Sequence, residues 1–336
     1  MSPVPGNRAV LLRAALGAAS CVIVAASAQQ QPYTPPKHTA PPPPALTRST
    51  PEEVVQQADG GTQIERDRPA SYALAEHRRL SRALGAVLPQ RKGVVDAYVL
   101  SIALDSDPVF GREAREAGKV LARRYDAVGR TITLGGSDGK APSPLPMGSP
   151  ANFEAALARI AEVMDEQEDV LILYATSHGA PFGVVYNDGN EGFGAMSPRR
   201  LAALLRAHGI ERRLLIISAC YSGVFVPSLS GPHSAVISAA ASDRSSFGCA
   251  AENDWTFFGD ALVNRALRKP QPLDAAVTAA LAEIAAWESR GELKPSLPQQ
   301  SIGVEVRAWL KPLEARMPKV ATQPVGRPSV DSLQGP

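Results

Sequence analysis

Short apolar runs alternate along the middle of the chain with longer segments whose apolar residues recur every three or four positions. The short runs predict buried strands at residues 96–104, 130–134, 170–175, 214–218 and 235–240. The longer segments predict helices at residues 113–125, 152–166, 198–207, 256–267 and 273–289. Because a helix precedes almost every strand, the pattern predicts an α/β fold with a mostly parallel sheet and helices on both faces.

The first 28 residues have the pattern of an export signal. Arg8 and Arg13 supply positive charge, residues 14–26 form an apolar run, and Ala26, Ser27 and Ala28 offer small residues for cleavage. The run is shorter than the roughly 20 apolar residues that a membrane-spanning helix needs. We therefore expect export to the periplasm or the extracellular space, and the alternative is a retained segment that anchors the protein in the membrane.

Composition divides the rest of the chain into three parts. Residues 29–70 are polar and rich in proline, which favours an extended linker over a packed core. The alternating pattern places a single α/β domain at residues 71–315. Proline, glycine, serine and glutamine dominate residues 316–336, which we expect to form a disordered tail.

Charge and motif content exclude several classes of function. The sequence of 336 residues holds 35 basic and 33 acidic side chains, a balance that does not favour binding to nucleic acid. The Gly-Gly pairs at 60–61 and 135–136 lack the Lys and Ser/Thr that continue a phosphate-binding loop. No group of His, Cys and carboxylate residues has the spacing of a zinc site, so we expect neither a metal nor another cofactor.

Two predicted strands end in a residue that can carry chemistry. The strand at 170–175 leads into Ser177, His178 and Gly179, and the strand at 214–218 leads into Cys220. Reactive groups of open α/β sheets gather beyond the carboxyl ends of the strands. An imidazole within hydrogen-bond reach of a thiol supports a thiolate nucleophile, so we expect Cys220 to be the nucleophile and His178 its general base.

Three further observations bear on this pair. His208 and Gly209 also form a His-Gly pair, but they end a predicted helix, where such a pair is an ordinary stop signal. The amides of Gly179 and Cys220 are candidates for an oxyanion hole. Cys249 leaves two alternatives open, since it is either a small buried apolar side chain or the partner of Cys220 in a disulfide.

The combination of a strand ending in Ser-His-Gly with a later strand ending in Ala-Cys-Tyr-Ser-Gly resembles the legumain-like cysteine peptidases, family C13 of the caspase-like clan. The segments at 236–249 and 255–260 resemble those that line the family's pocket for the residue before the cleaved bond. The resemblance covers residues 94–308. It implies a caspase-like fold, a peptide or protein substrate, and hydrolysis after Asn or Asp.

Carried over by position, the resemblance places Ser245, Ser246 and Asp260 in that pocket. The chain departs from the family twice. Ser218 stands where the family has an acidic residue two positions before the cysteine, and Arg112 is the one residue available to replace the family's Asn-x-Arg-His stretch. The sequence thus predicts a cysteine endopeptidase. Its alternatives are a transamidase of the same family and a non-catalytic envelope binding module on a caspase-like scaffold.

Overall fold

A six-stranded sheet in the order β10-β9-β8-β4-β2-β3 forms the centre of the computed structural model, which describes residues 1–2, 39, 43, 49–135 and 143–334. The strands are β2 (Ala97–Ala103), β3 (Thr131–Leu134), β4 (Val170–Thr176), β8 (Arg213–Ser218), β9 (Ser234–Ser238) and β10 (Gln299–Ile302). Neighbouring strands are parallel, except that β10 runs antiparallel to β9. The predicted mostly parallel sheet is confirmed.

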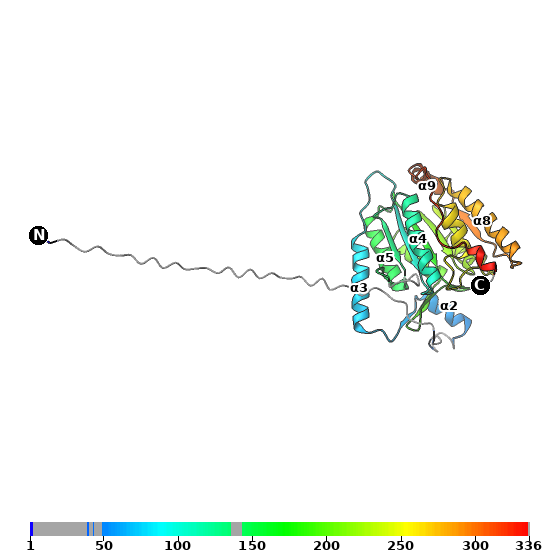
Figure 1. Ribbon diagram of the computed structural model, residues 1–336, viewed down its shortest axis with the longest axis horizontal. Coiled ribbons are helices and arrows are strands. Elements are labelled where there is room, and N and C mark those ends of the chain that lie inside the picture. The colour runs from blue at the N-terminus through cyan, green and yellow to red at the C-terminus, as the bar shows by residue number, and fades with distance from the viewer. Residues whose placement is uncertain (3–38, 40–42, 44–48, 136–142, 335–336) are drawn as a thin grey trace.

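Helices cover both faces of this sheet, as predicted. One face carries α4 (Pro108–Arg124), the π-helical segment η2 (Gly259–Ala266), α8 (Leu273–Arg290) and α9 (Val306–Ala315). The other carries α3 (Ala70–Gly85), α5 (Pro150–Val163), α6 (Pro198–Ala207) and α7 (Phe225–Leu229). Figure 1 shows α3 and α5 on one side and α8 and α9 on the other. Side chains alternate along each strand. Ile172 and Tyr174 of β4 therefore pack in the apolar core under the first set of helices, and Leu171 and Leu173 pack in the core under the second set.

A second, antiparallel sheet that the sequence pattern did not predict includes the segment directly after His178. Its strands, in spatial order, are β1 (Gln63–Glu65), β7 (Gly192–Met196), β6 (Gly183–Asp188) and β5 (Gly179–Ala180). Val184, Tyr186 and Met196 extend from it into the core cluster under α5 and α6. The small sheet therefore holds the segment after His178 against the main sheet.

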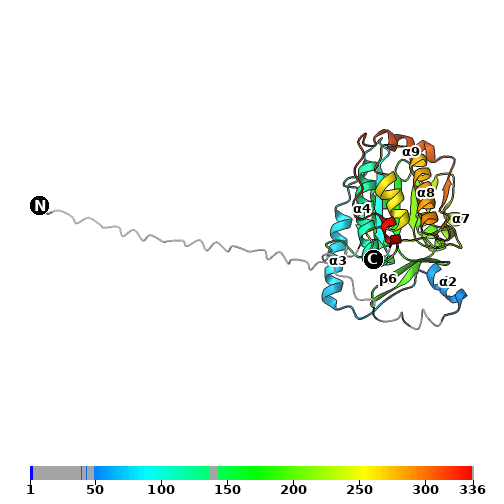
Figure 2. The same cartoon turned by 45° about the vertical axis from the view of Figure 1, so that its right-hand side comes forward.

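The structure differs from the expectation of a linker over residues 29–70. Helix α2 (Pro51–Asp59) forms within that range and lies near β6 at the lower end of the domain in Figure 2. Thr50 and Glu53 make a capping box at its first turn, which satisfies backbone N–H groups that would otherwise lack a partner. Strand β1 also lies within the range of the expected linker. Residues 29–48, apart from 39 and 43, lie outside the described residues, as does the expected export signal beyond residue 2.

The structure also differs from the expectation of a disordered tail. Residues 316–334 cross the face of the domain formed by α4 and η2 and end in a short helical turn, η3 (Ser329–Gln334). The backbone of Val325 exchanges hydrogen bonds with the side chain of Asn264, and Leu333 packs against the core. This segment docks mainly through backbone groups, and for that reason its composition does not reveal the contact.

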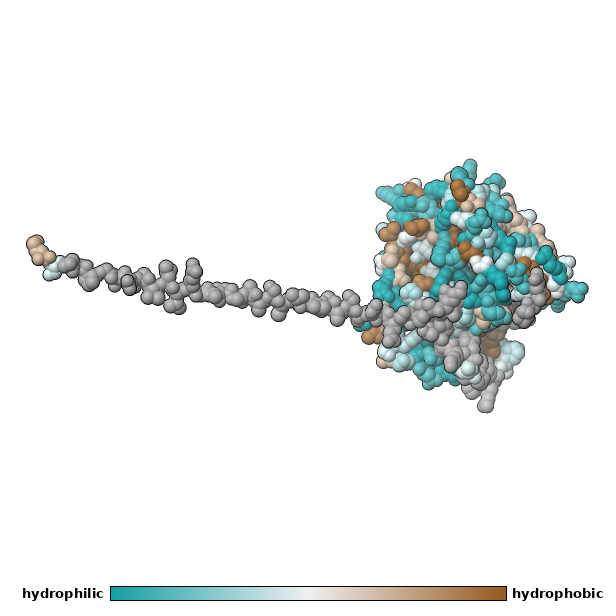
Figure 3. Space-filling view, in the orientation of Figure 1, coloured by the Kyte–Doolittle hydropathy of each residue, from teal (hydrophilic) through white to brown (hydrophobic). Residues whose placement is uncertain are grey.

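The surface is mixed in character. The face drawn in Figure 3 is mainly hydrophilic, with apolar residues scattered across it. Within the part of the chain that the structure describes, no helix has both the length and the apolar content to span a membrane.

Candidate active site

The pairing of β4 with β8 brings His178 and Cys220 to the same edge of the sheet. Thr176 and Ser218 are register partners at the carboxyl ends of these two parallel strands. His178 and Cys220 each come two residues later, and the amide of Ser177 donates to the carbonyl of Ser218 over 3.2 Å. Adjacent strands lie about 4.8 Å apart, so the two expected catalytic residues leave the sheet side by side.

Gly179 lies against the backbone of Cys220. A Cβ atom on residue 179 would stand 2.0 Å from the carbonyl oxygen of Cys220 and 3.0 Å from the Cβ of Ala219. No side chain fits at that distance, which explains the glycine after His178. The close approach joins the two strand exits into one compact site.

Cys220 occupies a sharp turn after β8. The next residue, Tyr221, has a φ of 57°, and its amide donates to the carbonyl of Arg244 over 2.8 Å. A tyrosine in the left-handed region is uncommon and occurs where surrounding contacts hold it, often at functional sites. The turn leaves Cys220 half-buried with its sulfur against Ser246, whose amide donates to Sγ over 3.3 Å. Cys220 and Cys249 are both free thiols.

His178 is held by a carboxylate that sequence reasoning did not select. Its Nε2 lies 3.4 Å from Oδ2 of Asp107, and the ring of Phe110 packs edge-on with a centroid distance of 5.0 Å. Hydrogen bonds to Asp107, and secondly to Cys249, raise the pKa of His178 to about 10 against the opposing effect of burial. An imidazole with this pKa carries its proton at neutral pH.

This protonation state changes the role expected for His178. A cationic imidazolium stabilises a nearby thiolate and can give a proton to a leaving group, whereas a general base must begin neutral. Between the described atoms of His178 and Cys220 there is no hydrogen bond; such bonds often tighten only when substrate is present. Cys249, for which the sequence left an apolar side chain or a disulfide with Cys220 as alternatives, is a free thiol that lies next to the imidazole.

Asp105, Asp107 and His178 form the group in the described residues whose ligand atoms could hold a metal ion, since these atoms lie within 4.8 Å of one another. The sequence predicted no such cluster, because the two aspartates are distant from His178 along the chain. The Nε2 of His178 is already directed at Asp107. The two aspartates therefore orient the imidazole and stabilise its protonated form.

Beneath the two strand ends lies the buried carboxylate of Glu113, from the first half of α4. It accepts hydrogen bonds from the hydroxyls of Tyr174, Thr176 and Ser218 and from the amide and hydroxyl of Thr256, all between 2.6 and 2.9 Å. Burial, and secondly the Glu113 carboxylate, hold the pKa of Tyr174 well above its ordinary value, so its hydroxyl remains a donor. A carboxylate removed from water needs such partners. Glu113 thus fastens β4, β8 and the segment at Thr256 together.

Arg112 faces Asp254 and not Asp260. Its Nε lies 3.3 Å from Oδ1 of Asp254, and its guanidinium also donates to the carbonyls of Ala251 and Asn253. Asp254 directly precedes the segment at 255–260, which resembles a pocket-lining segment of the family. That adjacency is the feature of the sequence that could have identified Asp254. Asp254 also accepts a hydrogen bond from the amide of Arg327, so this ion pair lies against the C-terminal segment.

The structure corrects the placement of Asp260 and Ser218 as substrate-binding residues. Asp260 is fully buried, and its carboxylate accepts from Asn264, Arg265 and the amide and hydroxyl of Ser329. Its role is to fix the C-terminal segment to η2. Ser218 is also buried, and its hydroxyl is directed to Glu113. Ser245 is exposed, and Ser246 contacts the sulfur of Cys220.

Comparison with known proteins supports the resemblance seen in the sequence. Residues 151–303 match the model of the Peptidase C13 family, a stretch that contains His178 and Cys220. No curated protein matches the sequence. The crystal structure of caspase-1 from Spodoptera frugiperda is similar with a TM-score of 0.42 and 12% identity, over 65% of this chain and 93% of that chain. The predicted likeness to the C13 family is confirmed, and the family match supports a peptidase.

Replacement of Asp107 by Asn is expected to lower the pKa of His178 from about 10 towards 6.5, because the largest stabilising partner of the imidazolium loses its charge. The raised pKa means that the ion pair stabilises the folded state fully below pH 6.5 and that this contribution is lost as the pH rises through about 10. NMR titration of the assigned His178 ring measures the shift. Superimposable titration curves for the two proteins would contradict the assignment of Asp107.

Replacement of Glu113 by Gln is expected to lower the free energy of unfolding by about 1–3 kcal/mol, because an amide nitrogen would face buried donors. Urea unfolding measures this change. Glu162→Gln is the matched control, since its side chain is 68% exposed and the same substitution there should alter stability by less than about 0.5 kcal/mol. Equal stability of the two variants would show that Glu113 does not fasten the strand ends.

Proposed function

We propose that this protein is an exported cysteine endopeptidase in which Cys220 is the nucleophile and His178 its partner. The observation that carries the proposal is the register of β4 and β8, which pairs Thr176 with Ser218 and sends His178 and Cys220 from the same sheet edge. The match of residues 151–303 to the Peptidase C13 family supports the same reaction class. Export is the expectation drawn from the N-terminal sequence.

In the proposed reaction the sulfur of Cys220 attacks the peptide carbonyl and forms a tetrahedral intermediate. The amides of Gly179 and Cys220 are the proposed donors to its oxyanion. The protonated His178 gives its proton to the nitrogen of the leaving amine as the carbon–nitrogen bond breaks, which leaves a thioester on Cys220. Neutral His178 then takes a proton from water, which attacks the thioester and releases the carboxylic acid and the Cys220 thiolate; the imidazolium and thiolate of the resting pair are thereby restored.

Asp107 is suited to the first of these proton transfers. Its carboxylate stabilises the cationic form of His178, so the proton needed by the leaving amine is in place before substrate binds. The amide of Ser246 directed at Cys220 Sγ provides a hydrogen-bond donor that suits a sulfur bearing negative charge. The resting pair is therefore proposed to be a thiolate and an imidazolium.

For the residue before the cleaved bond we propose a pocket of Arg112, Ser245 and Ser246, the positions that the family resemblance gives. The guanidinium and the two hydroxyls can donate hydrogen bonds to the side-chain oxygen of an Asn or Asp. We propose the preference for Asn or Asp that the family resemblance implies. Asp260 and Ser218 have no place in this pocket because their side chains are buried and bound elsewhere.

The two cysteines provide a matched pair of variants. Cys220→Ala is expected to reduce kcat/KM for an Asn-containing fluorogenic peptide by at least about a thousandfold with the fold intact, since the nucleophile is lost. Cys249→Ala should retain activity within about tenfold, because Asp107, the larger of the two hydrogen-bond influences on His178, remains in place. Assays against peptides with Asn, Asp, Arg or Ala before the cut measure both effects. Full activity of Cys220→Ala, or loss confined to Cys249→Ala, would contradict the assignment.

A further inference from the structure

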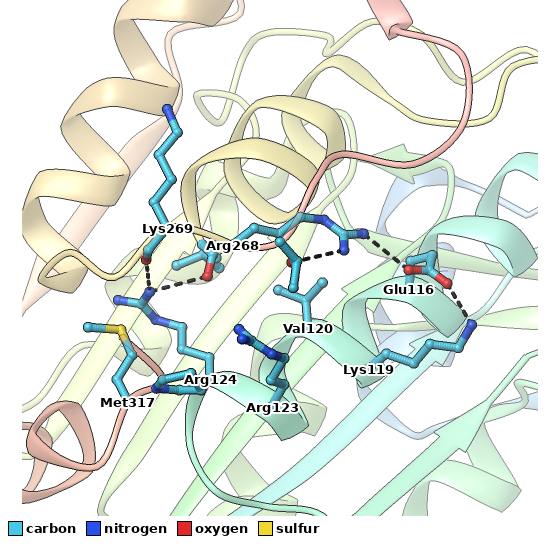
Figure 4. Close-up of a pocket in the computed structure, with 11 residues that line it drawn as sticks. Glu116, Lys119, Val120, Arg123, Arg124, Arg268, Lys269 and Met317 are labelled. Atoms are coloured by element: carbon cyan, nitrogen blue, oxygen red, sulfur yellow. Dashed lines mark hydrogen bonds and ion pairs between the residues drawn. The ribbon is translucent and has the colours of Figure 1, made fainter. Parts of the chain in front are cut away.

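A basic pocket lies toward the far end of α4 from His178 and Cys220, between that helix, the segment after η2 and the C-terminal segment. Its cavity has a volume of about 150 Å³, and its lining includes the cations Lys119, Arg123, Arg124, Arg268 and Lys269. Figure 4 shows Arg123, Arg124 and Arg268 gathered in the pocket, with Glu116 and Lys119 on one side and Lys269 and Met317 on the other. Among the described residues that line it, Glu116 is the only carboxylate.

The hydrogen bonds that Arg123 and Arg124 donate go to neutral carbonyls and not to carboxylates. Arg124 donates to the carbonyls of Leu267, Lys269 and Gln271, while its nearest carboxylate, Glu314, is 3.9 Å away. Arg123 donates to the carbonyl of Val320. Carbonyl partners hold a guanidinium in place but leave its positive charge uncompensated.

The single carboxylate is shared between two of the cations. Glu116 accepts from Lys119 over 2.6 Å and from Arg268 over 3.1 Å. Burial by itself would raise the pKa of Glu116, but these two partners outweigh it and hold the pKa below its ordinary value. Arg124 and Arg268 are more than nine-tenths buried, and the Nε–H of each has no hydrogen-bond partner in the described part of the chain. The pocket thus contains a concentrated excess of positive charge in a partly desolvated place.

We propose that this basic pocket binds a phosphate-type oxyanion. Guanidinium groups suit such an anion because their planar donors match its oxygens and their charge is weakly hydrated. The cavity of about 150 Å³ has room for a tetrahedral oxyanion.

The anion would also join the C-terminal segment to α4. Met317, Pro318 and Thr322 form one wall of the pocket, and Arg268 contacts both Thr322 and Glu116. A dianion between Arg123 and Arg268 would relieve the repulsion between these cations. This site is independent of the proposed peptidase reaction, so the failure of one proposal leaves the other intact.

Isothermal titration of the full-length protein with inorganic phosphate at constant ionic strength tests the site. Arg123→Gln should weaken binding about tenfold, since the exposed Arg123 is the central cation with one carbonyl partner. Arg82→Gln on α3 is the matched control, because it removes the same charge from an exposed position on another helix. Lys119→Gln is a second pocket variant, to be used if Arg123→Gln does not fold.

Cosedimentation with vesicles that contain phosphatidic acid distinguishes the two sources of the anion. Vesicle binding that Arg123→Gln removes and Arg82→Gln retains would identify a lipid phosphate, whereas binding of free phosphate alone would identify a soluble anion. Either result supports the proposal. Absence of binding in both arms, or equal binding by the wild type and the pocket variants, would overturn it.

Discussion

The buried carboxylate of Glu113 binds the carboxyl ends of β4 and β8 and fixes their positions relative to each other. It does so from a third element, α4, by accepting hydrogen bonds from both strands and from Thr256. A buried carboxylate loses the stabilisation of water, and each of these donors restores part of it, so the group tolerates little displacement. The positions of His178 and Cys220 depend on this contact, since each lies two residues beyond a strand end that Glu113 binds.

The same helix supplies the groups that tune the site. Asp107 immediately precedes α4 and pairs with His178, Phe110 packs on the imidazole, and Arg112 faces Asp254. Ser218 replaces the acid that the family carries two residues before the cysteine, and Glu113 of α4 provides a carboxylate to its hydroxyl. The acidic group at the base of the site thus comes from a helix and not from the strand, with the strand end contributing only a hydroxyl.

The parallel sheet was predictable because each inner strand is buried on both faces and therefore continuously apolar. The strands at β2, β3, β4, β8 and β9 all agree with the sequence pattern to within about two residues. The polar edge strand β10 and the two-residue strand β5 have no such signal, since their pairing depends on distant residues. His178 and Cys220 were predictable because they stand directly beyond the ends of β4 and β8. Asp105 and Asp107 stand in the same relation to β2 and could have been found in the same way, whereas the Arg112–Asp254 contact joins residues that no local pattern relates.

The central claim, an activated pair of Cys220 and His178, is tested most directly by the rate at which iodoacetamide alkylates Cys220 between pH 5 and 8 in the wild type and in His178→Ala. Mass spectrometry locates the label and separates Cys220 from Cys249. The account predicts rapid labelling of Cys220 in the wild type across this range and much slower labelling in His178→Ala, because the imidazolium stabilises the reactive thiolate. Slow labelling that is the same in both proteins would contradict it.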